Sequence, residues 1–430
     1  MKRRDSPPIG SDVQGARHRK RPRKSMKLIP EIVASADMIR AFRRHLHARP
    51  ELGYDVHGTS QFVAERLSDW GIEVTRGIGK TGVVGTLRRG RSTRAIGLRA
   101  DMDALPIEEA NTFEHRSQHA GMMHACGHDG HTSMLLGAAR HLALEGDFDG
   151  VVHFIFQPAE EGLAGGRAMV QDGLFDRFPC EAIFGVHNWP GLPVGHIGSR
   201  PGPLMAASAT FEVIVTGIGS HAAMPHASAD ALLAASQIVV ALQSIVSRNV
   251  DPIDSAVLSV CKINGGRADN VIAKECRLSG AVRTFDDSLL RNIGKRIEEV
   301  AQSVAKAFGC EALVEFRLAY PATVNDPDMA AFAMDVAQSV VGRDNVSRAI
   351  RQTMAGEDFA FMLKECRGCY AFIGNGDGSH REPGSGMGPC ELHNDSYDFN
   401  DELLPIGATY FVQLVNRYLK DGARSSSDAS

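Results

Sequence analysis

A cysteine and a histidine two residues apart are the first side chains in this sequence that could do chemistry. Cys126 and His128 lie in the stretch Met-His-Ala-Cys-Gly-His-Asp-Gly-His, residues 123–131. A thiolate and an imidazole at this spacing form a compact pair of ligands for a divalent metal ion. His131 ends the same stretch, but it can equally cap or pack the helix that we expect after Gly130. We therefore leave His131 out of the expected ligands.

Two adjacent carboxylates form the second such feature. Glu160 and Glu161 follow the apolar run Val-Val-His-Phe-Ile-Phe and precede a glycine-rich turn, residues 162–166. The end of a buried strand is where an α/β sheet presents active-site groups, and one carboxylate could bind a metal ion while its neighbour transfers protons. Each feature alone is weak, because adjacent glutamates usually lie on a solvated face. Together, a thiolate, an imidazole and paired carboxylates indicate a metal-dependent hydrolase.

Three more polar residues lie where the fold could bring them to this site. His187, in Phe-Gly-Val-His-Asn, and His393, in Leu-His-Asn-Asp-Ser, could both return to the same edge of a sheet. Asp103 follows a predicted strand and fits a position behind the metal ligands, where it would hold a ligand histidine in one tautomer. The alternative for Asp103 is a helix or turn cap.

The elements that must position these residues follow from the hydrophobic pattern. Ser35 can cap a helix whose apolar positions run from Met38 to Leu46 and whose pattern stops at Pro50, and a second helix is predicted over 59–70. Strands are predicted over 82–87, 95–100, 151–157 and 182–187, with a long helix over about 130–144. Alternating strands and helices predict a three-layer α/β catalytic domain.

The pattern changes after about residue 203. Strands over 209–216, 256–264, 276–284 and 312–318 alternate with helices over 231–247 and 290–307. This βαββαβ order is that of a ferredoxin-like domain, which interrupts the first domain. We expect the catalytic domain to comprise residues 28–202 and 319–420, and the inserted lid residues 203–318. Polar tails are expected to be disordered over 1–27 and 421–430.

Composition narrows the classes of protein. The chain has 430 residues, of which 43% are hydrophobic and 23% charged, as in soluble globular proteins. No continuous apolar run approaches the roughly 18 residues of a bilayer span. The first 27 residues hold ten Lys or Arg against two acids, whereas the remainder has a net charge of −12. A nucleic-acid-binding arm, a targeting segment and a translation start at Met26 are alternatives to a disordered tail. We expect no secretory signal, because no apolar core follows the basic residues.

Eight cysteines are scattered without a disulfide framework. In a chain of this length they indicate reduced thiols and a cytoplasmic protein. Cys366 and Cys369 form a C-x-x-C pair, which has no second pair to complete a metal site and is interpreted as structural.

With these residues assembled, the chain resembles the zinc-peptidase superfamily that includes aminoacylases and glutamate carboxypeptidases. It is most similar to the amidohydrolase branch with hippurate hydrolase and the indole-acetyl-amino-acid hydrolases. The resemblance covers about residues 38–418 and rests on six motifs: Arg44-His-Leu-His-Ala-Arg-Pro-Glu-Leu-Gly53, Leu98-Arg-Ala-Asp-Met-Asp-Ala-Leu-Pro106, His124-Ala-Cys-Gly-His-Asp129, Phe156-Gln-Pro-Ala-Glu-Glu-Gly162, Gly219-Ser-His-Ala-Ala-Met-Pro-His226 and Gly356-Glu-Asp-Phe359.

The resemblance implies two divalent metal ions, a lid that mediates dimerisation, and hydrolysis of the amide of an N-acyl amino acid. It implies that the metal ligands are Cys126, His128, Glu161, His187 and His393, with Cys126 bridging the ions. It also implies that Glu160 is the catalytic base, that His221 faces a substrate oxygen across the dimer, and that Asn270 and Arg283 lie near the substrate carboxylate. Ala273 stands where the family usually has proline, which bears on the geometry of that loop and not on the chemistry.

Several questions stay open at this stage. Cysteine and histidine favour zinc, but oxygen-rich positions also admit manganese, cobalt or nickel. The alternative enzymes are a deacetylase of an intermediate such as N-acetyl-diaminopimelate, and a dipeptidase. A homodimer, or a tetramer, is the expected assembly, with no membrane partner. A non-enzymatic protein that binds nucleic acid through its basic arm is the alternative from another class, and the presence of Glu160 argues against it.

Overall fold

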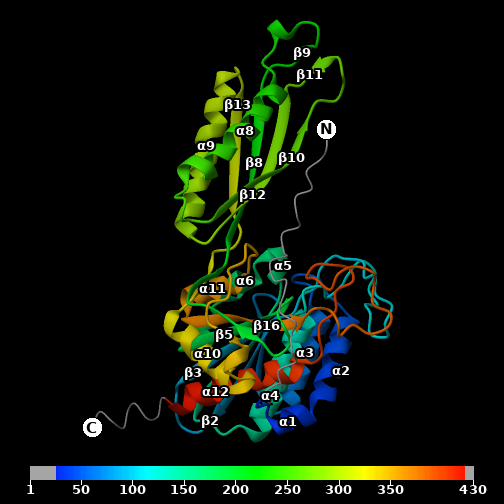
Figure 1. The fold of residues 1–430 in the computed structure, drawn as a ribbon, viewed down its shortest axis with the longest axis vertical. Coiled ribbons are helices and arrows are strands. Elements are labelled where there is room, and N and C mark those ends of the chain that lie inside the picture. Colours follow the sequence, from blue (N-terminus) through cyan, green and yellow to red (C-terminus); the bar gives the residue numbers. More distant parts are fainter. Residues whose placement is uncertain (1–25, 422–430) are drawn as a thin grey trace, which may run out of the picture.

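The computed structural model describes residues 26–421, which form a large α/β domain and an elongated lid that projects from it (Figure 1). The predicted disorder of the tails falls mostly outside the described residues. The exceptions are Met26 and Lys27, which belong to the fold: the Lys27 amide donates to the Val340 carbonyl at 2.7 Å. At the other end, Asp421 is the last residue of a helix.

The large domain is built on one eight-stranded sheet. Across the sheet the strands lie in the order β1 (Glu73–Ile78), β2 (Gly82–Arg89), β4 (Gly150–Gln157), β3 (Ala95–Asp101), β5 (Ala182–Pro190), β16 (Gly368–Gly376), β6 (Ile197–Gly198) and β15 (Val346–Ser347). The central strands β4, β3, β5 and β16 are parallel, whereas β1, β2 and β4 pair antiparallel. Each predicted strand of this domain lies within β2, β3, β4 or β5.

Helices cover both faces of the sheet, which confirms the predicted three-layer α/β class. One face packs against α1 (Pro30–Ala34), α2 (Ala36–His47), α3 (His57–Asp69), α4 (His128–Glu145), α10 (Pro327–Val341) and α12 (Leu403–Asp421). The other face packs against α6 (Gly165–Gln171), α7 (Leu174–Arg177) and α11 (Phe359–Glu365). With helices on both sides, the central strands are buried along almost their whole length.

The predicted cap at Ser35 is wrong in its mechanism. Ser35 does precede α2, but its side chain accepts no hydrogen bond from the first turn of that helix. Its hydroxyl donates instead to the Glu31 carbonyl at 2.8 Å, because Ser35 also ends the short helix α1. The hydrophobic pattern did not predict α1, and a serine between two helices can hydrogen-bond to the first as well as to the second.

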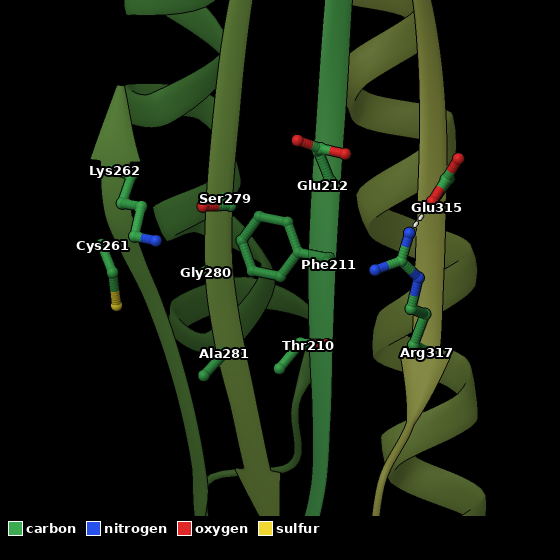
Figure 2. A pocket seen from close by; sticks show the side chains of 10 residues that line it. All are labelled: Thr210, Phe211, Glu212, Cys261, Lys262, Ser279, Gly280, Ala281, Glu315 and Arg317. Carbon is green, nitrogen blue, oxygen red and sulfur yellow. Dashed lines mark hydrogen bonds and ion pairs between the residues drawn. The ribbon is translucent and has the colours of Figure 1, made fainter. Parts of the chain in front are cut away.

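The lid has the predicted βαββαβ order. Its elements are β8 (Ala207–Thr216), α8 (Ala231–Asn249), β10 (Ala256–Gly265), β12 (Glu275–Thr284), α9 (Asp287–Ala307) and β13 (Glu311–Leu318). The four strands form an antiparallel sheet in the order β10-β12-β8-β13, and α8 and α9 pack on one face of it. The other face carries a shallow cavity of about 360 Å³ over the middle of the sheet (Figure 2). Gly280 is required there, because a Cβ would lie 2.6 Å from the ring of Phe211.

The lid helix α8 bears on the prediction that no apolar run is long enough to span a membrane. By length and mean hydropathy, α8 is apolar enough to cross a bilayer, and 33% of its residues in that stretch are buried. The core helix of a soluble domain can have the same length and composition. In the lid, α8 contributes Ile238, Leu242 and Ile245 to the apolar core against the sheet.

A narrow neck joins the two parts. β7 (Gly202–Met205) enters the lid and pairs antiparallel with β14 (Thr323–Asn325), which leaves it. We propose that the domain boundaries, predicted at 203 and 318, lie at this neck. At the far tip of the lid, β9 (Ser220–His221) pairs with β11 (Val271–Ile272), well away from the large domain (Figure 1).

Candidate metal centre and active site

A cavity of about 410 Å³ lies where the carboxyl ends of the central strands face the base of the lid. Both parts of the chain line it. The large domain contributes Cys126, Glu160, Glu161, His187, Glu357 and His393, and the lid and neck contribute Ser208, Arg283 and Tyr320. The position agrees with the rule that α/β sheets bind ligands beyond the carboxyl ends of their strands.

The five expected metal ligands converge at this cavity. Ligand atoms of Cys126, His128 and His187 lie within 4.8 Å of one another, and so do those of Cys126, Glu161 and His393. Cys126 belongs to both groups. Two sets of three donors that share one thiol are the arrangement expected for two ions bridged by a cysteine.

The sharp turn before α4 brings Cys126 and His128 together. Gly127 between them has φ +91°, and a Cβ there would lie 2.3 Å from the Asn188 side-chain oxygen. Only glycine fits this turn, because an added side chain would be both strained and obstructed. The Cys-Gly-His sequence is therefore required by the backbone as well as by the chemistry.

Hydrogen bonds fix the orientation of both buried histidines. His128 Nδ1 donates to the backbone carbonyl of Asp103 at 2.8 Å, and His187 Nδ1 donates to the carbonyl of Asn188 at 2.6 Å. A carbonyl can only accept, so the proton of each neutral ring lies on Nδ1 and Nε2 has a free lone pair. His187 Nε2 lies 3.3 Å from Cys126 Sγ, and His128 Nε2 is buried without a hydrogen-bond partner among the described residues.

Glu161 and His393 complete the cluster on its solvent side. Glu161 Oε1 lies 3.3 Å from His393 Nε2, and this buried oxygen makes no hydrogen bond within the described chain. The His393 amide donates to the Ala125 carbonyl at 2.8 Å, which ties a segment near the C-terminus to the loop of Cys126. His393 has φ +61°, a costly conformation for a non-glycine residue. Buried acceptor atoms without hydrogen-bond partners, such as His128 Nε2 and Glu161 Oε1, fit a site for cations.

Asp103 organises the two glutamates through its side chain. Its carboxylate accepts from the backbone amide of Glu160 at 2.9 Å and from that of Glu161 at 3.0 Å. Asp103 thus contacts both parts of the site, because its carbonyl accepts from His128 and its carboxylate accepts from the amides that begin α5 (Glu160–Leu163). That it holds a metal ligand in one tautomer stays a prediction. Ala159 and Ala164, on either side of this turn, have positive φ of 56° and 57°.

Glu160 is buried beside other carboxylates. Its oxygens lie within 4.8 Å of those of Glu357 and Asp358. Burial, and then the charge of Glu357, raises the pKa of the Glu160 carboxyl well above its usual range. The hydroxyl of Tyr320 donates to the Glu160 backbone carbonyl, so the neck of the lid contacts the residue directly.

A buried charge network lies behind the cavity, and the sequence did not reveal its role. Arg99 is 1% exposed and its guanidinium contacts Asp101 at 2.6 Å, Glu357 at 2.9 Å and Asp358 at 3.1 Å. These acids surround Arg99 and hold its pKa well above the usual range, against the opposing effect of burial. Arg99, Glu357 and Asp358 all lie in motifs quoted above. The signal available in the sequence was the pair of charges, Arg99 and Asp101, inside an otherwise apolar strand.

His131 has both ring nitrogens engaged. Nδ1 lies 2.7 Å from Asp101 Oδ1, and Nε2 lies 2.7 Å from the Asn188 side-chain oxygen. Donor atoms of Asp101, His128 and His131 are close enough to hold an ion. Asp101, however, is already bound by Arg99, so these residues form a partnered network around the cluster. Asn188 is a second residue that the sequence did not indicate, and it also contacts the hydroxyl of Tyr397 at 2.6 Å.

The structure separates the three predicted substrate residues of the lid. Arg283 on β12 lines the cavity, where its guanidinium donates to the Met354 carbonyl at 3.4 Å. His221 on β9 is exposed at the tip, beside Asn270, whose carbonyl accepts from the Ala222 amide at 3.0 Å. Within one chain, His221 and Asn270 are thus remote from the cluster (Figure 1).

Comparison with known proteins bears on the identity of this site. Residues 97–417 match Peptidase family M20/M25/M40. The chain is 41% identical to hippurate hydrolase of Campylobacter jejuni over 92% of this chain and 100% of that protein. It is 40% identical to N-acetyl-L-cysteine deacetylase of Bacillus subtilis over 89% of this chain and 88% of that protein.

A solved structure supports the same relationship. A Bacillus subtilis protein described as a dinuclear metal binding peptidase from the M20 family superposes with a TM-score of 0.77 at 32% identity, over 90% of this chain and 99% of that one. These matches confirm the predicted class, a hydrolase of the zinc-peptidase type with an inserted lid. The chain belongs to Peptidase family M20/M25/M40.

Proposed function

We propose that this protein is a metal-dependent amidohydrolase that cleaves an N-acyl amino acid into a carboxylate and a free amino acid. The observation that carries the proposal is the convergence of five donors around Cys126, two of which have buried atoms without partners. The similarity to a hippurate hydrolase supports an acyl amide as the substrate. The second relative, an N-acetyl-L-cysteine deacetylase, keeps a smaller acyl group as the alternative.

Two divalent ions would be held by Cys126, His128, Glu161, His187 and His393, with Cys126 shared. Zinc suits the thiol and imidazoles, and manganese, cobalt or nickel are the alternatives. Bound ions of this kind lower the pKa of a coordinated water to about 7 and polarise the amide carbonyl. The Nε2 lone pairs of the two buried histidines, and the Glu161 oxygen that makes no hydrogen bond within the described chain, fit such ions.

Glu160 would act as the general base. Its carboxylate lines the cavity beside the proposed ligands, and Asp103 and Tyr320 fix its backbone from two sides. It would take a proton from the attacking water and deliver that proton to the leaving amine. A raised pKa suits the second step, because the carboxyl must hold the proton until the amide nitrogen receives it.

Arg283 would bind the carboxylate of the amino acid, since its guanidinium faces the cavity from the lid. His221 and Asn270 would serve the site of a second chain, His221 by stabilising the developing charge on the acyl oxygen and Asn270 near the substrate carboxylate. A homodimer through the lid is the assembly we propose. Leu233 and Val240 on α8, and the edge strand β10, are exposed there and could pair with a second copy.

The first experiment measures glycine release from hippurate by the metal-loaded protein, after chelation, and after zinc or manganese is restored. A Glu160→Gln variant is measured alongside, and its metal content is determined. We expect metal-dependent activity that the variant loses by several orders of magnitude while it keeps its metal. A dipeptide cleaved faster than hippurate and N-acetyl-amino acids would identify a dipeptidase instead.

The shared site is tested by complementation. A heterodimer of Glu160→Gln and His221→Ala chains, purified through two different tags, contains one site with both residues if His221 acts across the dimer. We expect about half of the wild-type activity, because one of two symmetric sites is complete. An inactive heterodimer would show that each chain uses its own His221.

The proposed location is the cytoplasm. All eight cysteines are free thiols, as expected for a reducing compartment. The alternative of a nucleic-acid-binding arm concerns residues outside the described part of the chain. Loss of salt-sensitive DNA binding on deletion of residues 1–25, together with no hydrolase activity, would favour it.

A further inference from the structure

Two thiols from distant segments of the chain face each other at the end of the large sheet away from the metal centre. Cys180 lies two residues before β5, and Cys366 lies two residues before β16, which runs parallel to β5 as its neighbour (Figure 1). The two Sγ atoms are 3.8 Å apart, although 186 positions separate the residues. His187, at the metal centre, lies toward the opposite end of β5.

The C-x-x-C pair of the sequence is therefore divided. Cys366 belongs to the apolar cluster on the α11 side of the sheet, and its thiol also contacts the Cys180 carbonyl at 3.4 Å. Cys369 belongs to the cluster on the other face, where its Sγ lies 3.3 Å from the hydroxyl of Ser199. The partner of Cys366 is thus Cys180, which is partly exposed and gives small oxidants access to the pair.

We propose that Cys180 and Cys366 form an oxidation site, at which a peroxide converts the two thiols into an intramolecular disulfide. One thiolate attacks the peroxide oxygen, which gives a sulfenic acid and releases water. The second thiol then attacks the sulfenic sulfur, the S–S bond forms and a second water leaves. Two thiols are oxidised by two electrons and one hydrogen peroxide is reduced to two waters.

The local geometry favours this reaction. A disulfide bond is about 2.05 Å long, so the two sulfurs need to approach by less than 2 Å, which side-chain rotation can supply. The hydrogen bond from the Cys180 thiol, together with the charge of Arg367, lowers the pKa of the Cys366 thiol. Cys366 is thus the better nucleophile of the two, because the thiolate is the reactive form.

The bond would connect the two halves of the large domain. Cys180 lies before the lid insertion and Cys366 lies after it, so the closed loop would contain the whole lid. A disulfide that closes a long loop removes more freedom from the unfolded chain than one that closes a short loop. We expect a rise in melting temperature of about 5–10 °C on oxidation.

The test uses the full-length, metal-loaded protein treated with hydrogen peroxide, then with an alkylating reagent under non-reducing conditions. Peptide mass spectrometry should identify a Cys180–Cys366 link, and the melting temperature should rise and return on reduction with dithiothreitol. Cys180→Ser and Cys366→Ser should each lose both effects. Cys261→Ser, which removes an exposed thiol in the lid, is the matched control and should keep them.

Each outcome decides the proposal. The Cys180–Cys366 link with a reversible rise in melting temperature supports it. Alkylation of both thiols after peroxide treatment, or a link from Cys366 to Cys369, would overturn the assignment of the pair. A Cys180–Cys366 disulfide that forms without a rise in melting temperature would refute the stabilising effect. Both serine variants keep Cys126 and receive the same peroxide. Any effect that comes from oxidation of Cys126 would therefore persist in them.

Discussion

Substitution of Asp103 by asparagine is the sharpest test of how this site is built. The Asp103 carboxylate is 1% exposed and accepts hydrogen bonds from two consecutive backbone amides, those of Glu160 and Glu161. An asparagine side chain has the size of aspartate and keeps one of its two acceptor oxygens. Its NH₂ group takes the place of the other oxygen and cannot accept from the second backbone amide. The carbonyl of residue 103, which orients His128, stays in place.

The magnitude follows from the bonds that are lost. A hydrogen bond to a charged group is worth about 1.5–3 kcal/mol, so one lost bond and one weakened bond should destabilise the turn by about 2–4 kcal/mol. If about 2–3 kcal/mol of this is expressed in the reaction barrier, kcat falls about 30–150-fold. The metal content should stay close to that of the wild type, because none of the five proposed ligands is removed.

The assay compares kcat, metal content and urea unfolding of the metal-loaded variant with those of a matched control. Asp149 offers that control, because its carboxylate also accepts from two backbone amides, those of Arg91 at 2.6 Å and Ser92 at 2.7 Å, but on the surface. Asp149→Asn should leave both stability and kcat close to those of the wild type, because this carboxylate is exposed. An Asp103→Asn enzyme with wild-type kcat and stability would refute the reasoning.

Three further predictions concern the rest of the fold. Arg99→Met should cost about 3–5 kcal/mol in urea unfolding, because it leaves buried acids unpaired, whereas Arg317→Met, at an exposed ion pair, should cost less than about 1 kcal/mol. Burial, and then Arg88, lowers the pKa of His153 to about 4, so the folded state resists a proton that the unfolded state accepts below about 6.5. The free energy of unfolding should thus decrease as the pH is lowered from about 6.5 to 4. At pH 5 the wild type should have lost about 2 kcal/mol more than His153→Gln has lost. Chelation should lower the melting temperature by about 10 °C, measured with and without added zinc.

The metal cluster was predictable because its residues lie in short, chemically unusual motifs. Cysteine and histidine separated by one glycine, and two glutamates after a buried strand, place donors at loops that the strand pattern already locates. His393 was a candidate by its position in the chain, and the resemblance made it an expected ligand. Its position depends on the hydrogen bond between its amide and the Ala125 carbonyl, a contact between distant segments that no local pattern encodes.

The network behind the cluster was not predictable for the opposite reason. Arg99 lies in β3, whose other residues except Asp101 are apolar, and its three acidic partners come from two segments more than 250 positions apart. A buried arginine is stable only with partners, so its presence implied that acids must be nearby. Two of those acids lie just before α11, and their place beside Arg99 depends on how this distant segment packs on the assembled sheet.

The length of the lid separates its tip from the cavity. β8 and β12 are each ten residues long and run from the cavity, where Ser208 and Arg283 lie, toward the tip that carries His221. At about 3.3 Å per residue such strands span about 30 Å, which is too far for the tip to reach the cluster below it by adjustment of side chains. We therefore propose that His221 serves the site of a second chain, and the complementation experiment measures that dependence directly.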